Sequence, residues 1–139
     1  MDHVAILDTK RKLLAKIISG EKTIESRWYK FKKTPYQNIA IGDVVYFKES
    51  GKPVSVRSKV AKTIFIDKLS PEKINYILNQ YASQLGVSLS YAEHCAGKNF
   101  CTLIFLKQVE PIEPFHIDKK GYGAMAAWIT LEDIKKIKR

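Results

Sequence analysis

The pattern of apolar and polar positions divides the chain into short strands and helices. Residues 4–7 form an apolar run that is typical of a short buried strand. We expect a helix next, capped by Asp8 or Thr9 and ended by Gly20. Its apolar positions fall on one face: Leu13, Leu14, Ile17 and Ile18. Residues 23–29 then mix apolar and polar side chains, as in a strand with one face open to a cleft.

Two further strands are predicted in the middle of the chain. A turn at Gly42 and Asp43 leads into the apolar strand 44–48. Residues 54–67 alternate strictly, which predicts a long, half-buried strand with an exposed basic face. The buried face would carry Val54, Val56, Val60, Ile64 and Ile66, and the exposed face Ser55, Arg57, Lys59 and Thr63.

The strongest helix signal follows at Ser70, where a capping serine precedes a proline in the first turn. This helix should end at Gly86 and bury one face, made of Ile74, Ile77, Leu78, Tyr81 and Leu85. The capping box formed by Ser90 and Glu93 predicts a second, shorter helix that ends at Gly97.

Residues 101–109 are the clearest strand in the sequence, and Pro111 and Pro114 should limit pairing beyond it. Residues 122–129 could return to the sheet. Thr130 is placed to cap a last short helix that carries Ile134 and Ile137.

Helices inserted between strands without regular alternation indicate an α+β fold. A small β-barrel flanked by α-helices would satisfy the backbone of its edge strands. The length of 139 residues and the 45% hydrophobic content suit one compact core, so we expect a single domain over residues 1–139.

The charge of the chain adds a functional prediction to the predicted fold, namely that the protein binds an anionic partner. The net charge is +10, which attracts anionic partners, most commonly nucleic acid. Between residues 10 and 33 there are nine basic and two acidic residues, so this window carries +7 of the total. This concentration argues against the alternative that the charge only keeps the protein soluble.

Several other classes of function are disfavoured by the sequence. No segment resembles a signal peptide or a membrane span, so we expect a cytoplasmic protein that does not contact membranes. Cys95 and Cys101 have neither redox nor zinc-ligand spacing and should be free thiols. His3, His94 and His116 are widely spaced, so no metal site and no cofactor is predicted.

The most informative segment is residues 19–27, at the corner between the first helix and the following strand. Strand alternation places Thr23, Glu25 and Arg27 on one face, and Lys22 sits at the corner. A guanidinium held beside a carboxylate keeps donors free for a phosphate or a base edge. Lys22 could neutralise phosphate, or act as a base if burial lowered its pKa. A surface ladder of ion pairs remains an alternative.

The pattern Gly20-x-Lys22-x-x-Glu25-x-Arg27, after an amphipathic helix and before the Gly42 turn, resembles the ASCH family of the PUA-like superfamily. This resemblance covers about the first half of the chain and implies a small β-barrel with helices, with the motif lining a cleft for RNA or a nucleotide-like ligand. It carries over Lys22, Glu25 and Arg27 as candidate binding residues.

The resemblance also implies two alternatives to simple binding. Some members of the family are similar to hydrolases that deacylate N4-acetylcytidine with a lysine, a threonine and a glutamate. Lys22 matches that lysine, and Glu25 stands where the threonine would be. In an amidohydrolase, Lys22 and Glu25 would be catalytic, with Glu25 activating water. A protein-interaction module like a transcription coactivator is the other alternative.

Aromatic residues complete the predicted site, because a base stacked on such a ring gains about 1–3 kcal/mol. Trp28 adjoins the motif directly. Tyr122 and Trp128 lie in or just after a segment that contains two glycines. We therefore include Trp28, Tyr122 and Trp128 among the candidate ligand-binding residues, with a core position for Trp128 as the alternative.

Overall fold

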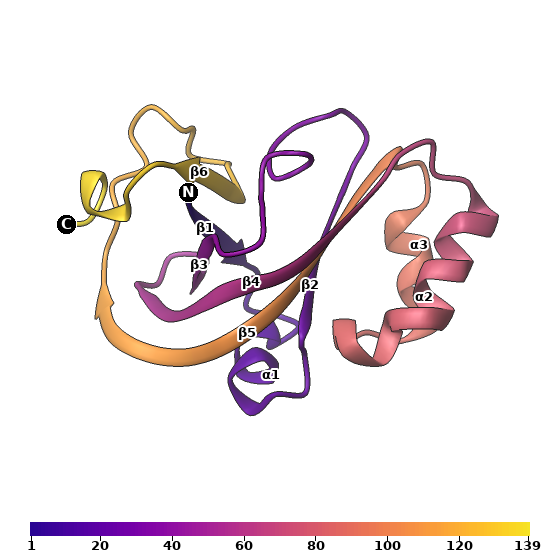
Figure 1. The fold of residues 1–139 in the computed structure, drawn as a ribbon, viewed down its shortest axis with the longest axis horizontal. Coiled ribbons are helices and arrows are strands. Elements are labelled where there is room, and N and C mark those ends of the chain that lie inside the picture. The colour runs from indigo at the N-terminus through magenta and orange to yellow at the C-terminus, as the bar shows by residue number, and fades with distance from the viewer.

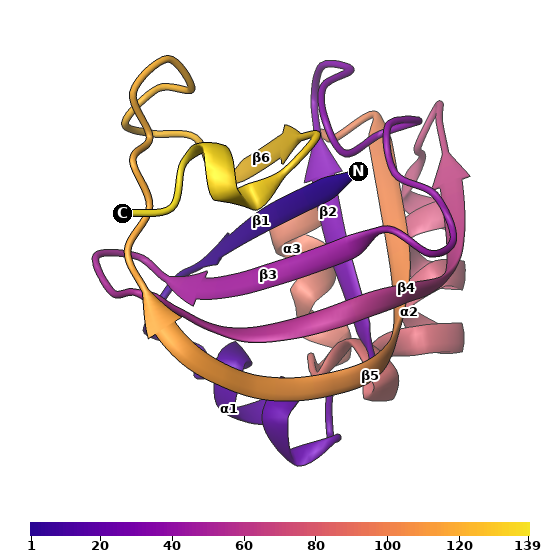
Figure 2. The ribbon, with the colours of Figure 1, turned by 60° about the vertical axis from the view of Figure 1, so that its left-hand side comes forward.

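The computed structural model describes residues 1–139 and contains one six-stranded sheet that curls into half a barrel, as Figures 1 and 2 show. In sheet order the strands are β2 (Ile24–Tyr29), β5 (Phe100–Phe115), β4 (Val54–Ile66), β3 (Val44–Glu49), β1 (Asp2–Leu7) and β6 (Trp128–Leu131). Only β1 and β3 pair in parallel. The predicted α+β class is confirmed, with β2 and β6 as the two edges of the sheet.

Three helices pack against the curled sheet, and they contact two different apolar clusters. They are α1 (Leu13–Ser19), α2 (Pro71–Leu85) and α3 (Ala92–Cys95), with short 3₁₀ turns η1 (Leu89–Tyr91) and η2 (Ile134–Lys136). Neither α2 nor any other helix is long and apolar enough to cross a membrane.

Apolar side chains gather in three clusters that fix these elements. The first lies between α1 and the sheet and contains Phe47 and Ile104. The second joins α2 to β2 and β5 through Ile24, Leu78 and Leu103. The third lies beneath the C-terminal segment. Since β2 faces the second cluster with Ile24, its Glu25 side chain is directed to the other face.

Helix α2 agrees with its prediction at both ends. The Ser70 hydroxyl accepts a hydrogen bond from the Lys73 N–H, and Gly86 ends the helix at a φ of 74°. Ile74, Ile77 and Leu85 are buried as expected. Capping and termination act through near neighbours in the chain, which is why the sequence was sufficient here.

The predicted cap of α1 is wrong. Asp8 Oδ1 accepts from the N–H groups of Lys10 and Arg11, so Asp8 closes a turn and the helix begins only at Leu13. Gly20 ends it as predicted. Leu13 and Ile17 are buried as predicted, but Ile18 is 49% exposed and does not belong to the buried face.

The predicted capping box before Gly97 is also wrong. Ser90 lies inside the η1 turn, and its hydroxyl pairs with that of Ser88 at 2.6 Å. Because the Ser90 hydroxyl bonds to Ser88, it does not cap a longer helix. Helix α3 therefore spans only Ala92–Cys95.

Strand β4 does not keep one buried face along its length. The register with β5 shifts between Val60 and Lys62, as in a β-bulge. Because a one-residue shift exchanges the two faces, Ile64 and Ile66 pack against the α2 cluster, whereas Phe65 joins the cluster of Val60.

Strand β5 continues past the predicted limit at Val109, since Pro111 still pairs with Val56 and Phe115 with Val54. Strand β2 pairs only with Phe100–Phe105, so the second half of β5 has a single neighbour. A proline is tolerated where its missing N–H faces an unpaired edge.

The C-terminal predictions hold only in part. The return to the sheet begins at Trp128, and Tyr122 lies in the preceding loop. Thr130 belongs to β6, so it does not cap the last helical turn; Asp133 does, by accepting from the Lys135 N–H. Ile134 and Ile137 are buried as predicted.

Candidate functional site

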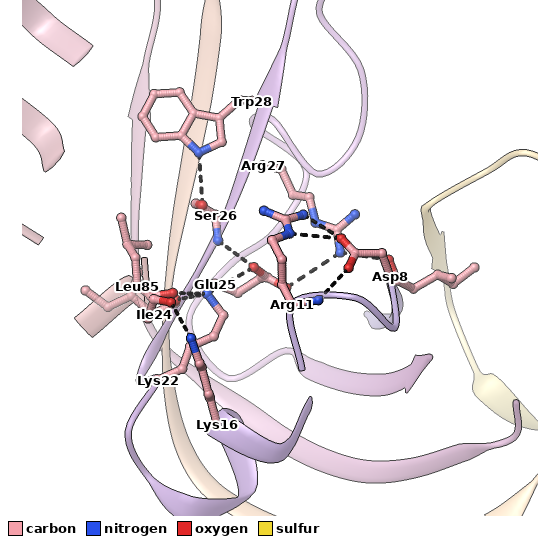
Figure 3. Close-up of polar contacts among 12 residues, drawn as sticks. Asp8, Arg11, Lys16, Lys22, Ile24, Glu25, Ser26, Arg27, Trp28 and Leu85 are labelled. Atoms are coloured by element: carbon pink, nitrogen blue, oxygen red, sulfur yellow. Dashed lines mark hydrogen bonds and ion pairs between the residues drawn. The ribbon is translucent and has the colours of Figure 1, made fainter. Parts of the chain in front are cut away.

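A cleft of about 300 Å³ opens along β2, on the side that faces the loop before α1. The predicted residues Lys22, Glu25, Arg27 and Trp28 line it. Ser26 and Tyr29 of the same strand also line the cleft. The remaining lining residues come from three other segments: Ile6, Leu7, Asp8, Arg11 and Leu13; Val87, Tyr91, His94 and Lys98; and Ala127. Figure 3 shows Glu25 between Lys22 and the two guanidinium groups.

Lys22 lies at the floor of the cleft with 2% of its surface exposed. Its Nζ donates to the carbonyl oxygens of Ile24 at 2.8 Å and Leu85 at 2.7 Å, and lies 3.5 Å from Glu25 Oε1. Two of the three donors of the ammonium group are therefore used by backbone carbonyl groups, and the Glu25 carboxylate lies at ion-pair distance. Burial lowers the pKa of Lys22, with Glu25 opposing the shift.

Glu25 is the second buried charge of the site, with 3% of its surface exposed. Its Oε1 accepts from the Ser26 N–H at 2.8 Å, whereas Oε2 has no hydrogen-bond partner. Burial alone would raise the pKa of this carboxyl, but the charges of Lys22 and Arg27 outweigh burial and lower it. The site therefore holds a carboxylate with one unused acceptor.

Arg27 joins the two edges of the curled sheet. It projects from β2 and donates to the carbonyl oxygen of Ile6 at 3.3 Å and to that of Ala127 at 3.1 Å. Its Nη2 lies 3.6 Å from Glu25 Oε2, too far for a hydrogen bond. The predicted barrel is thus closed here by a side chain instead of a ladder of backbone hydrogen bonds.

Trp128 lies behind Arg27 and is largely buried, at 5% exposure. The Arg27 guanidinium carbon is 5.1 Å from the centre of the Trp128 ring, within the range of a cation–π contact. Trp128 Nε1 donates to His3 Nδ1 at 3.2 Å, and His3 Nε2 donates to Asp43 Oδ2 at 2.9 Å. These bonds hold Trp128 as a support for Arg27, and the ring does not line the cleft.

The His3 side chain was not recognised as part of this network from the sequence. It is fully buried, and burial lowers the pKa of His3 although Asp43 acts in the opposite direction. A neutral imidazole that accepts at Nδ1 and donates at Nε2 satisfies both partners. Since Asp43 and Trp128 are distant in sequence, no local signal could have connected them to His3.

The other two predicted aromatic residues lie differently. Trp28 lines one side of the cleft, donates through Nε1 to the Ser26 hydroxyl at 2.9 Å, and packs in the α2 cluster. Tyr122 is 40% exposed in the loop before β6 and does not line the cleft.

The rim of the cleft contains residues that the sequence did not single out. Arg11 forms a two-pronged ion pair with Asp8, with nitrogen–oxygen distances of 2.7 and 3.0 Å, as Figure 3 shows. The Arg11 guanidinium carbon lies 5.4 Å from the Tyr91 ring centre, and Tyr91 stacks on His94. Arg11 belongs to the basic window of the sequence, whereas nothing in the sequence marked Tyr91.

The side chains of the cleft resemble those of a site for an organic ligand more than those of a metal site. No group of three His, Cys, Asp or Glu side chains comes together in the molecule. The cleft contains a buried carboxylate acceptor, the guanidinium groups of Arg11 and Arg27, and aromatic rings at the rim. These groups suit a planar ligand that carries hydrogen-bond donors.

Comparison with solved structures finds the same fold in an ASCH protein from Zymomonas mobilis. Its crystal structure matches with a TM-score of 0.72, covering 97% of this chain and 90% of that chain at 18% sequence identity. A single-residue variant of that protein gives a TM-score of 0.71. A protein from Enterococcus faecalis V583 is more distant, with a TM-score of 0.52, 14% identity, and 74% and 68% of the two chains covered.

No model of a known protein family matches the chain, and no curated protein sequence matches it. The likeness is therefore one of fold, which the ASCH-like motif around Lys22 had predicted.

Proposed function

We propose that this chain, which has the ASCH fold, binds RNA or a modified nucleoside with the base in the cleft beside Glu25. The observation that carries the proposal is Glu25 Oε2, a buried carboxylate oxygen without a hydrogen-bond partner. Most buried polar atoms are hydrogen-bonded, so an unpaired carboxylate oxygen beside a cleft is a candidate partner for a ligand. The amino group of a base is a suitable donor, as in the pairing of a carboxylate with the amino group of cytosine.

The other residues of the cleft could bind the base, the sugar and the phosphate of a nucleotide. Tyr91 and Tyr29 are only partly buried at the rim and offer faces for stacking. Arg11 and Lys98 add positive charge for a phosphate. The volume of about 300 Å³ lies at the lower end of small-molecule sites.

Arg27 is the group that a ligand would have to displace. It is the nearest cation to Glu25 Oε2, which is closed off from solvent. A base that donates to Oε2 would take the space next to it, and Arg27 would turn toward the ligand. Its guanidinium could then stack on the base or bind a phosphate.

Replacing Glu25 by glutamine tests this proposal, because the change removes the charge and nearly preserves the shape. We expect affinity for RNA and for the nucleosides bound to fall by about ten-fold or more, in line with the loss of a hydrogen bond to a charged group. Fluorescence anisotropy with labelled RNA and calorimetry with a nucleoside panel would measure it.

The matched control is Glu132→Gln, since the side chain of Glu132 is 78% exposed on the C-terminal segment. Thermal melts would show that both variants are folded. Equal affinity of the two variants and the unchanged protein would refute a role for Glu25 in binding.

An amidohydrolase remains the second candidate, because a lysine with a lowered pKa lies 3.5 Å from the buried Glu25 carboxylate, at its Oε1. Against it, the Lys22 ammonium group is held by two backbone carbonyl groups and faces the Glu25 carboxylate, so it would have to leave these partners to transfer a proton to a ligand. Incubation with N4-acetylcytidine, followed by chromatography, separates the candidates. Turnover that disappears in Lys22→Ala would support catalysis, and its absence across acylated nucleosides would leave binding alone.

A further inference from the structure

Four residues directly after β2 form an exposed basic and aromatic surface, which we call the 30–33 tract: Lys30, Phe31, Lys32 and Lys33. All four are exposed, and Phe31 keeps 74% of its surface accessible. None of the three lysines forms an ion pair with a carboxylate. Lys30 Nζ lies 5.9 Å from the centre of the Phe31 ring, and both the ring and the lysines remain accessible to a ligand.

The tract continues directly from the cleft. Tyr29, the last residue of β2, lines the cleft, and Lys33 Nζ lies 4.4 Å from its ring centre. Asn99 holds this junction, because its N–H donates to the Tyr29 carbonyl and its Nδ2 to the Lys30 carbonyl, both at 2.9 Å. In Figure 2 the loop that follows β2 lies at the opposite end of the strand from α1.

These features fit a single-stranded nucleic acid. Unpaired lysines neutralise phosphates, and an exposed ring stacks an unpaired base. Bases in a duplex are already stacked, so a duplex could not use Phe31 in this way. A free nucleoside has no phosphate and is too short to fill the cleft and reach Phe31 as well.

We infer that the 30–33 tract is a second contact for the ligand, and that this ligand is single-stranded RNA with one base in the cleft and a neighbouring base on Phe31. The inference rests on the proposed function of the cleft. A lipid surface would also attract three lysines and an aromatic ring. The direct connection to a cleft with a buried carboxylate favours nucleic acid, since the amino group of a base can donate a hydrogen bond to that carboxylate.

The experiment compares a nucleoside with a short single-stranded RNA on the same set of variants. We expect Phe31→Ala to weaken RNA binding by roughly ten-fold, as for the loss of one stacked base, and to leave nucleoside binding unchanged. Lys32→Ala should weaken RNA binding and reduce the slope of log affinity against log salt by about one.

Each variant has a matched control elsewhere on the surface. Tyr76 on α2 is 71% exposed, so Tyr76→Ala removes a ring of similar exposure. Lys135→Ala removes an exposed lysine from η2, and Lys135 does not line the cleft. Neither control should change RNA affinity by more than about two-fold, because an isolated surface charge far from the ligand acts weakly.

The possible outcomes separate this inference from the function on which it rests. If the protein binds nucleosides and RNA but the two tract variants behave like their controls, the second contact is refuted and cleft binding stands. If neither ligand binds the unchanged protein, both proposals fail. If the tract variants lose binding to phosphatidylserine vesicles while RNA binding is unchanged, the tract is a lipid surface and the inference is wrong.

Discussion

The guanidinium of Arg27 lies over the ring of Trp128, at 5.1 Å from its centre, and joins two strands that share no backbone hydrogen bond. Arg27 comes from β2 and Trp128 from β6, the two edges of the curled sheet. Arg27 also donates to the carbonyl groups of Ile6 and Ala127. One side chain therefore closes the sheet at the point where the candidate cleft opens.

Arg27→Lys should weaken the contact between the two edges of the sheet although the substitution preserves the positive charge. A lysine has no planar fork, so it cannot donate to both carbonyl groups and lie flat on Trp128. We expect the free energy of unfolding to fall by about 1–3 kcal/mol, the range for hydrogen bonds to charged groups. Urea denaturation measures this loss, and hydrogen exchange should show faster exchange of the Ile6 amide, which bonds to the Ala127 carbonyl.

Arg57→Lys is the control for this change, since the ion pair of Arg57 with Glu110 is exposed on the sheet. It should alter stability by less than about 1 kcal/mol. Equal losses in the two variants would mean that Arg27 has no special role in closure.

Lys22→Met should be strongly destabilising whether or not Lys22 also takes part in function. The change leaves the Leu85 and Ile24 carbonyl groups without their donor and Glu25 without its nearest buried cation. Removing one partner of a buried ion pair costs about 3–5 kcal/mol. Urea denaturation would measure this loss.

Lys16→Met provides the comparison, because the half-buried Lys16 donates to a single carbonyl, that of Gly86. Its cost should be about 1 kcal/mol. A loss of similar size for Lys22→Met would show that the Lys22 ammonium group does not stabilise the fold through its buried contacts.

His3 should make the protein less stable in mild acid. Its pKa in the folded protein is lowered below the ordinary value of 6.5 by burial, so the unfolded chain binds a proton first as the pH falls. Stability is therefore complete above about pH 6.5 and is lost below it. Glu25 adds a similar loss only below its ordinary value of 4.5, since its pKa is also lowered.

Urea unfolding between about pH 5 and pH 8 isolates the histidine effect. His3→Gln should flatten the dependence of stability on pH in this range, at the cost of a lower overall stability. His116→Gln, which removes an exposed histidine, should keep the slope of the unchanged protein. An unchanged slope in His3→Gln would contradict the assignment.

The two cysteines should not react in the folded protein. Both are buried free thiols, and burial raises the pKa of Cys95 to about 12 and that of Cys101 further. Only the thiolate attacks a disulfide reagent such as DTNB, so labelling at neutral pH should require denaturant. Ser50→Cys places a thiol at an exposed position and should be labelled at once. Rapid labelling of the unchanged protein would contradict the buried positions.

Predictions that depend on neighbouring residues were confirmed by the structure. The start of α2 at Ser70 and its end at Gly86 follow from capping and from a left-handed glycine, which act within one turn. The strand Val44–Glu49 follows from a short apolar run. The motif around Lys22 carried enough information to predict the ASCH fold.

Two other local predictions were wrong because a competing hydrogen bond between near neighbours formed instead of the predicted cap. Asp8 satisfies a turn before α1, and Ser90 pairs with Ser88, so neither caps a helix. The bulge near Val60 depends on how β4 pairs with β5, and it changed which side chains the strand buries. Residue preferences alone do not decide between competing local hydrogen bonds, and the bulge depends on a partner strand that is distant in the sequence.

The sequence by itself determined the strand and helix pattern, the concentration of positive charge around Lys22, and the alternation that directs Glu25 and Arg27 to one side of a strand. Only the tertiary structure decided that Lys22 is held by the Leu85 carbonyl, that Arg27 reaches Ala127, and that Tyr91 stands at the rim. The physical reason is that periodicity and charge are properties of adjacent residues. A buried carboxylate with an unused oxygen exists only once the whole sheet has curled around it.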